Sequence, residues 1–216
     1  MKKYMYFMLF LVFFTCNKDS KENKTEVDED QETCALDKED KLKQLYNATV
    51  IPLFSGYNDI DIPTEFQIIE DEMGIDAGAS FGYVEVSMGL INVSEESIQL
   101  FALTHEVAHI ATLSQARLFN LDGYVSSGPE TNEYRKSEYL ADLIAIHLIK
   151  SQEPVYFESL TKNFQELMNI LGSGSFTHPS GPNRIKAMQN YIALSNAKTE
   201  TIAFKALYIN IWEDKM

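Results

Sequence analysis

Three polar residues in one predicted helix have the types and the spacing of a zinc-dependent hydrolytic site. They lie in "FALTHEVAHIATL", residues 101–113, where His105 and His109 stand four positions apart. On an α-helix this spacing is about 400° of rotation and roughly 6 Å of rise, so both imidazoles leave one face and can bind one Zn²⁺. Glu106 flanks that face, where it can take a proton from the activated water without binding the metal. The alternative is a buried core helix whose two histidines are only hydrogen-bonded.

A third protein ligand is expected on a later element. Metzincins would place a histidine at position 115, where this chain has Gln115, so that class is excluded. The best candidate is Glu138 in "SEYLAD"; Asp142 follows one turn later on the same face and can accept the free ring N–H of a ligand histidine. The alternative is that both acids belong to a solvated polar face, although the surrounding sequence is apolar. His147 would point half a turn away from Glu138 and is expected to be structural.

The helices that would position these residues follow from the apolar periodicity of the chain. The zinc-binding helix is expected to start after the N-cap residue Ser94 and to end near Leu113. Further helices are expected from residue 41 to the region of Pro52, over residues 130–150, over residues 154–171 and after Pro182. The tail after residue 198 is apolar, but its period does not decide between helix and strand.

Two short strands are also predicted, over residues 65–70 and 83–88. In the second strand polar and apolar residues alternate from Tyr83 to Met88, which is typical of a half-exposed strand. Taken with the helices, this pattern predicts an α+β fold, mostly helical with a small β-sheet. The folded domain is expected to span residues 41–216.

Residues 1–15 are predicted to be an export signal rather than part of the fold. Two lysines precede an apolar run from Tyr4 to Phe14, which is too short to cross a bilayer of roughly 30 Å. Cys16 follows this run as in the lipobox of bacterial lipoproteins, where the cysteine is acylated and becomes the new N-terminus. An ordinary cleaved signal or a short anchor is the alternative.

Residues 16–40 are predicted to be a flexible acidic tether, because this segment is charged, nearly free of apolar residues and without period. It contains Cys34, which would be unpaired if Cys16 were acylated. A Cys16–Cys34 disulfide in an unlipidated protein is the minor alternative. We therefore expect an exported domain at the cell envelope, held to a bacterial membrane by an N-terminal lipid anchor.

The charge of the chain argues against nucleic acid as a partner. The 216 residues include 18 basic and 32 acidic ones, which gives a formal net charge of -14. Neutralising phosphates needs a basic face, and none is visible in the sequence. The hydrophobic content of 45% is enough for a real core.

Three segments, in this order, resemble the gluzincin metallopeptidases of metallopeptidase family 48, the HtpX and CAAX prenyl protease type. Residues 82–110 are similar to the strand, the "GL" turn and the zinc helix of that family. "SEYLAD", residues 137–142, resembles its third-ligand helix, and "THPSGPNRIKAM", residues 177–188, resembles its C-terminal element. The chain departs from the family where "DAGAS" places Asp76 instead of an asparagine. It looks like the compact envelope members of the family.

The resemblance implies a zincin-like endopeptidase domain with one zinc ion per chain. In such a domain His105, His109 and Glu138 would bind the metal, and Glu106 would be the general base. His178 and Arg184 would reach into the cleft, one to stabilise the oxyanion and the other to contact the main chain of the substrate. The alternative for this last pair is a cap histidine and a surface arginine.

The resemblance also implies how protein or peptide substrates would bind. The strand would form the edge of the sheet beside the active-site cleft and bind substrate by β-addition. The residues assigned to this contact are Tyr83, Val84, Glu85 and Val86.

The function expected from these observations is a zinc-dependent endopeptidase that hydrolyses envelope proteins, misfolded ones in particular. A second hypothesis is a chaperone-like adaptor or latent protease that keeps the zinc ion but rarely cleaves. A purely structural zinc site is disfavoured, because Glu106 would have no structural use and three ligands leave a fourth position open.

Overall fold

The computed structural model describes residues 29–80, 82–121 and 131–213. The predicted export signal, residues 1–15, and the predicted lipidation site, Cys16, lie outside these described ranges. Within them, no helix combines the length and the apolar character that a membrane crossing needs. The described chain is mostly helical with one small sheet, so the predicted α+β class is confirmed.

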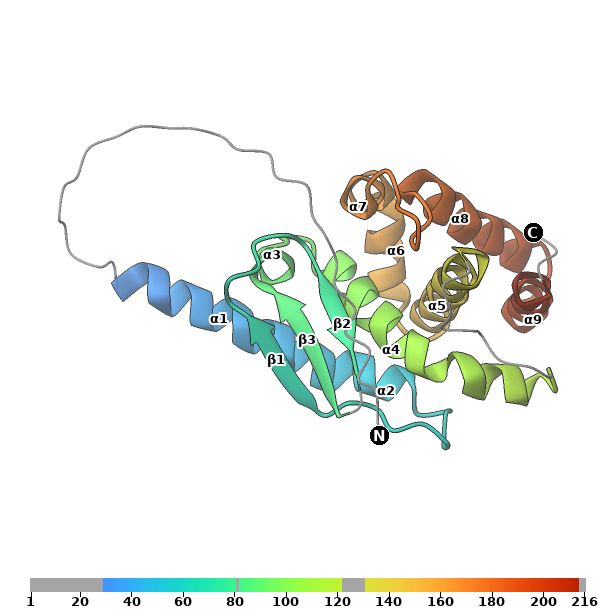
Figure 1. The fold of residues 1–216 in the computed structure, drawn as a ribbon, viewed down its shortest axis with the longest axis horizontal. Coiled ribbons are helices and arrows are strands. Elements are labelled where there is room, and N and C mark those ends of the chain that lie inside the picture. Colours follow the sequence, from blue (N-terminus) through green and yellow to red (C-terminus); the bar gives the residue numbers. More distant parts are fainter. Residues whose placement is uncertain (1–28, 81, 122–130, 214–216) are drawn as a thin grey trace.

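The first described element is a long helix that lies along one face of the sheet (Figure 1). It consists of α1 (Glu29–Leu45), the π-helical turn η1 (Tyr46–Val50) and the short α2 (Ile51–Leu53). Leu42, Leu45 and Tyr46 are buried, because their spacing of three and four residues places them on one side of the helix. The helix begins at Glu29, inside the segment 16–40 that we predicted as a tether.

The sheet has three strands in the order β1 (Glu65–Ile69), β3 (Tyr83–Ser87) and β2 (Ala77–Ala79). Strand β1 pairs with β3 in parallel, and β2 pairs with β3 in antiparallel orientation. The two strands predicted from sequence, β1 and β3, are confirmed. Strand β2 was not predicted, because its three small residues show no alternating pattern.

The position of β3 corrects one expectation. Its backbone is paired on both sides, so the segment that contains Tyr83, Val84, Glu85 and Val86 is not an edge strand and cannot add a substrate strand. The two valines are fully buried, which a central strand requires on its core-facing side. The edge that borders α4 belongs to β2 instead (Figure 1).

The remaining helices are the short α3 (Met88–Ile91), which lies at one end of the sheet and contacts β3 and α1, and a group that forms a second layer beside the sheet (Figure 1). This group consists of α4 (Glu96–Leu118), α5 (Thr131–Gln152), α6 (Pro154–Lys162), α7 (Phe164–Leu171), α8 (Gly181–Ala197) and α9 (Glu200–Trp212). The helix predicted to bind zinc, α4, starts after Glu95 rather than Ser94 and runs past Leu113. The predicted helix over 154–171 is interrupted at Asn163, and the undecided tail is helical.

Helices α4 and α5 form the centre of the fold. They pack along each other, and α4 also contacts β2 while α5 also contacts α6, α8 and α9. The run from Leu140 to Ile146 in α5 is buried at every position, because helices surround it on several sides. The polar residues that α4 and α5 carry in their contact region therefore lie in an apolar environment, where each one needs a partner.

Candidate metal centre

Two histidine side chains from α4 converge in the contact region between α4 and α5. The Nε2 atoms of His105 and His109 are 3.1 Å apart, and the two rings meet edge to face at 84°. Their spacing of four residues on a regular helix produces this convergence, as the sequence predicted. His105 is buried and His109 is half-buried, so the pair has one side toward the core and one side toward solvent.

Glu138 on α5 completes a group of three possible ligands. Its Oε2 lies 3.5 Å from Nε2 of His105, and its Oε1 lies 3.4 Å from Nε2 of His109. The three ligand atoms lie within 4.8 Å of one another, so this buried group could hold a metal ion. Two ligands about 2.0–2.1 Å from a tetrahedral metal stand roughly 3.3 Å apart, and the 3.1 Å between the two imidazole Nε2 atoms is close to that value. The donor set and its geometry therefore fit Zn²⁺.

The other nitrogen of each imidazole also has a partner. Nδ1 of His105 lies 3.0 Å from Oδ1 of Asp142, and Nδ1 of His109 lies 3.1 Å from the hydroxyl of Ser137. A carboxylate can only accept, so Nδ1–H of His105 donates to Asp142, and Nε2 is the atom that faces the ligand group, where a metal ion would take the place of its proton. Ser137 permits the same tautomer for His109. Asp142 thus has the predicted position, whereas Ser137 was missed although it directly precedes Glu138 in the chain.

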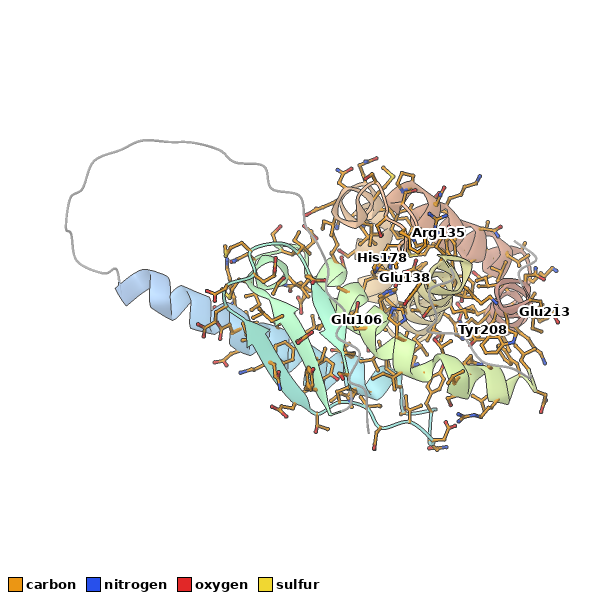
Figure 2. The ribbon with its side chains drawn as sticks, viewed as in Figure 1. Glu106, Arg135, Glu138, His178, Tyr208 and Glu213 are labelled. Carbon is orange, nitrogen blue, oxygen red and sulfur yellow. The ribbon has the colours of Figure 1, made fainter. Side chains whose placement is uncertain are left out.

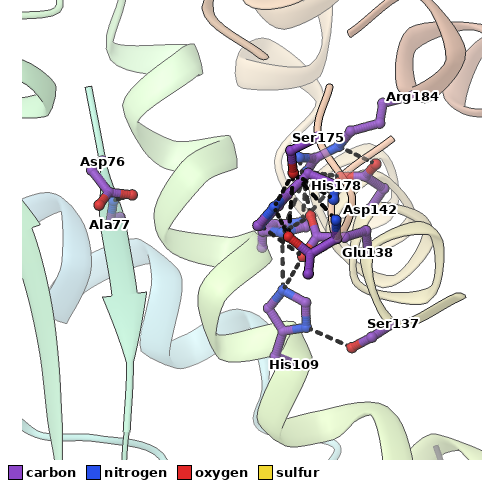
Figure 3. Close-up of polar contacts among 11 residues, drawn as sticks. Asp76, Ala77, His109, Ser137, Glu138, Asp142, Ser175, His178 and Arg184 are labelled. Atoms are coloured by element: carbon purple, nitrogen blue, oxygen red, sulfur yellow. Dashed lines mark hydrogen bonds and ion pairs between the residues drawn. The ribbon is translucent and has the colours of Figure 1, made fainter. Parts of the chain in front are cut away.

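Arg184 on α8 binds the carboxylates of both Asp142 and Glu138 on α5. Its Nε and Nη2 donate to the two oxygens of Asp142 at 2.8 and 2.7 Å, and its Nη1 lies 3.1 Å from Oε2 of Glu138. The side chain is buried, so it is not the surface arginine of the alternative reading. All three guanidinium nitrogens are engaged with acids, so this geometry suits a positioning residue better than contact with a substrate (Figure 3).

The charges of this cluster shift the pKa values of its members in opposite directions. Burial and Arg184 lower the pKa of His105, but hydrogen bonds to Asp142 and Glu138 outweigh them and raise it to about 9. Burial raises the pKa of Glu138, yet hydrogen bonds to both histidines hold it well below its ordinary value. A metal ion that binds here must displace the proton that His105 retains at neutral pH.

Glu106 lies on the side of α4 that faces the sheet, as Figure 2 shows. It is half-buried and is not one of the three possible ligands. Burial raises the pKa of its carboxyl group, the charges of His105 and His109 lower it, and those of Glu138 and Asp76 raise it again. These influences come from the ligand group on one side and from Asp76, just before β2, on the other, and together they leave the Glu106 carboxyl with a pKa above its ordinary value.

His178 is carried by the loop between α7 and α8. Its Nε2 lies 3.6 Å from Oε1 of Glu138, and its Nδ1 lies 2.8 Å from the hydroxyl of Thr177. Burial lowers the pKa of His178, so the ring is neutral at pH 7. The loop can turn here because Gly174 has φ +83°, and Gly181 lets its end approach the carbonyl of Met168. The structure thus brings His178 to the edge of the metal centre, as the sequence predicted.

His147 is separate from this group, as expected for a structural histidine. Its ring stacks on Phe204 with 4.1 Å between centroids, and its Nδ1 lies 2.8 Å from the hydroxyl of Tyr191. Burial lowers the pKa of His147 to about 4. The ring is therefore neutral and shares one hydrogen bond with the Tyr191 hydroxyl.

Comparisons with known proteins find no counterpart for this chain. No protein-family model, no curated protein and no solved structure matches it. The arguments for its function therefore rest on its own residues and geometry.

Proposed function

We propose that this protein is a zinc-dependent metalloendopeptidase with a zincin-like domain. The observation that supports this most is the convergence of His105, His109 and Glu138, with Glu106 next to His105 on α4. Three protein ligands leave a fourth position for water or substrate, which is the pattern of catalytic rather than structural zinc sites. The resemblance of three sequence segments to the gluzincins points the same way.

The residues around the metal centre have distinct parts in the proposed hydrolysis. A bound Zn²⁺ would supply Lewis-acid chemistry for the attacking water and the scissile carbonyl. Glu106 would accept the proton of that water and transfer it to the leaving amine, and its raised pKa suits a group that must hold this proton in between. His178, neutral and half-exposed at the edge of the centre, would donate a hydrogen bond to the developing oxyanion.

Arg184 has a different part in this proposal from the one that the sequence suggested. Its guanidinium fixes Asp142 and Glu138, and Asp142 in turn fixes the ring of His105. Such outer contacts orient the ligands and raise their affinity for the metal. We therefore assign Arg184 to the positioning of the zinc ligands and not to the substrate.

The substrate backbone would pair with the free edge of β2. The backbone N–H of Ser87 donates to the carbonyl of Asp76, and the backbone N–H of Ser80 donates to the carbonyl of Tyr83. In an antiparallel ladder alternate residues direct their backbone groups to the partner strand, so Ala77 and Ala79 direct theirs to the opposite edge of β2. The carboxyl of Asp76 accepts from the backbone N–H of Ala77 at 3.0 Å. The groups left for a substrate strand are then the carbonyl of Ala77 and both backbone groups of Ala79.

The cellular setting is part of the proposal and rests on the sequence alone. The apolar run of residues 1–15 followed by Cys16 is typical of an exported lipoprotein. A lipid anchor would hold the enzyme at the bacterial envelope, where unfolded envelope proteins are the expected substrates.

The substitution Glu106→Gln tests the proposal. The full-length zinc-loaded variant should keep about one zinc ion per chain, because Glu106 is not a ligand, whereas cleavage of an unfolded protein such as reduced casein should fall by at least 10²-fold. Zinc is measured by atomic emission and cleavage by mass spectrometry of the fragments. The matched control is Glu166→Gln, which removes an exposed acid of α7 and should change neither quantity.

Two outcomes would contradict the enzyme. One is undiminished cleavage by Glu106→Gln, and the other is a zinc-loaded wild type that cleaves no unfolded protein. The second outcome, with casein still bound, would favour the adaptor or latent protease.

A further inference from the structure

A polar cavity lies directly beside the metal centre and has no role in the chemistry described so far. It has a volume of about 260 Å³ and lies between α5, the loop before α8 and the start of α8. Its walls include Arg135, Tyr139, Ser175, His178 and Asn183. A water molecule takes roughly 30 Å³, so the cavity has ample room for the side chain of an aspartate or a glutamate.

Helix α5, the loop before α8 and α8 itself contribute residues both to the metal centre and to this cavity. On α5, Arg135 stands three residues before Glu138, which places both on one side of the helix. On α8, Asn183 directly precedes Arg184. His178 belongs to both places, because it lines the cavity while its Nε2 lies 3.6 Å from Glu138 (Figure 2). A group in the cavity therefore lies next to His178, at the edge of the candidate metal centre.

The charge of the cavity is opposite to that of the chain as a whole. The chain carries a net charge of -14, yet none of the described residues that line this cavity is acidic and one of them is Arg135. Arg135 is exposed, and its Nη2 donates a 3.3 Å hydrogen bond to the carbonyl oxygen of Ser175. Among the residues whose side chains the structure describes, no acid is paired with Arg135, so its guanidinium fork is open to an anionic partner.

A second cavity contains an arginine whose charge is compensated by a carboxylate. It has a volume of about 300 Å³ and is lined by Asp59, Ser114 and Arg117 among others. There Nη1 of Arg117 lies 2.6 Å from Oδ2 of Asp59, and Ser114 donates to the same carboxylate. That cavity provides its own anion, whereas the cavity beside the metal centre does not.

We infer that the cavity lined by Arg135 is a substrate subsite that binds a carboxylate of the peptide. Arg135 would form the ion pair, and the hydroxyl and amide groups of Tyr139, Ser175 and Asn183 offer further hydrogen-bond donors. This inference rests on the proposed function, since it names the substrate class of the same site. The carboxylate can come from an acidic side chain near the scissile bond or from the C-terminus of the peptide.

The test uses binding as well as cleavage, so that it does not depend on turnover. Four fluorescent twelve-residue peptides of alanine and serine would be compared, with a central Glu or Gln and with a free or amidated C-terminus. Anisotropy with the full-length, zinc-loaded Glu106→Gln protein gives the dissociation constants, and the wild type gives kcat/KM. We expect a carboxylate to improve both quantities roughly 10- to 100-fold, as charge-assisted hydrogen bonds do.

Substitutions then locate the preference. Arg135→Gln should bring the ratio of dissociation constants between carboxylate and neutral peptides close to one. Arg135→Glu should bind a fifth peptide, with a central Lys, more tightly than the peptide with a central Glu. Arg117→Gln, in the compensated cavity, is the matched control and should leave the ratio unchanged. A preference that follows the central Glu identifies a side-chain subsite, and one that disappears on amidation identifies a C-terminal subsite.

The outcomes separate this inference from the proposed function. A preference in binding that requires Arg135, without any cleavage by wild type, would support the subsite and contradict the enzyme. Equal binding and cleavage of all four peptides, or a preference that survives in Arg135→Gln, would overturn the subsite. Circular dichroism of the Arg135 variants shows that they are folded, so a lost preference reflects the cavity.

Discussion

His105 and His147 are both enclosed in the helical layer, yet their environments differ in kind. His105 is surrounded by Asp142, Glu138 and Arg184, and its pKa is raised to about 9. His147 lies between the Phe204 ring and the Tyr191 hydroxyl, and its pKa is lowered to about 4. One environment stabilises a positive charge in the core, and the other excludes it.

The two environments differ in the free energy that is needed to bury them, and this distinguishes a functional histidine from a structural one. Each ionised group loses several kcal/mol of hydration free energy when it is buried, and only interactions with partners can offset this loss. A cluster of buried charges therefore contributes little to the stability of the fold. The environment of His147 involves no buried charge and needs one hydrogen bond. The cluster around His105 is therefore understandable as a metal centre, and it should respond to substitution and to metal in ways that the His147 region does not.

The largest effect is expected where one buried charge loses its partner. Arg184→Met removes the cation between Asp142 and Glu138, and the metal-free protein should lose about 3–5 kcal/mol of unfolding free energy. Saturating zinc should reduce this loss, because the metal supplies the missing positive charge. Urea denaturation followed by circular dichroism, in chelator and in excess zinc, measures both values.

The control for this substitution is another arginine in an exposed ion pair. Arg117 is paired with Asp59, but both side chains are largely exposed, so Arg117→Met should cost at most about 1 kcal/mol. A loss of the same size for Arg184→Met in chelator, or one that zinc does not reduce, would contradict the view that Arg184 balances the charges of a metal centre.

A pH-dependent effect of intermediate size is expected at His147. Its pKa is about 4 in the folded protein against an ordinary value of 6.5, so the unfolded chain binds the extra proton first. Stability should therefore fall as the pH decreases from about 6.5 to about 4, by at most roughly 3 kcal/mol from this group. Above pH 6.5 this contribution is constant, because the ring is neutral in both states.

The variant His147→Gln should lack this part of the pH dependence while it keeps a hydrogen-bonding group near Tyr191. Carboxylates and other histidines titrate in the same range, so the quantity to compare is the difference in unfolding free energy between wild type and variant at each pH, in chelator. A difference that stays constant between pH 7 and pH 4 would show that burial does not depress the pKa of His147. Zinc content at pH 7.5 should equal that of wild type.

The positions of the candidate metal ligands on their helices could be predicted from sequence because helix geometry is regular. A spacing of four residues fixes the relative position of His105 and His109 whatever the rest of the fold does. The same regularity places Glu138 and Asp142 on one face of α5. His147, at a different angle on α5, was correctly separated from them.

Pairing between strands follows no such local rule, and the prediction that residues 83–86 form an edge strand was wrong for this reason. The alternation from Tyr83 to Met88 identifies a strand, but it does not tell whether another strand covers its outer side. Strand β2, Ala77–Ala79, is short and made of small residues, so it left no signal. The position of Arg184 behind the carboxylates likewise depends on how α8 packs on α5, which a single sequence does not reveal.

The smallest effect is expected at Ser137, the partner of the more exposed ligand. Ser137→Ala removes the hydroxyl that lies 3.1 Å from Nδ1 of His109, so the ring loses its fixed orientation but keeps its Nε2 lone pair. Zinc affinity should fall about 10-fold, at the low end for outer contacts of a ligand, because a hydroxyl orients an imidazole less strongly than a carboxylate does. Ser151→Ala, on the same helix and bonded only to its own backbone turn at Leu148, is the control and should leave affinity unchanged. Competition with a chromophoric chelator measures both constants, and equal affinities for the two variants would mean that His109 is oriented by packing alone.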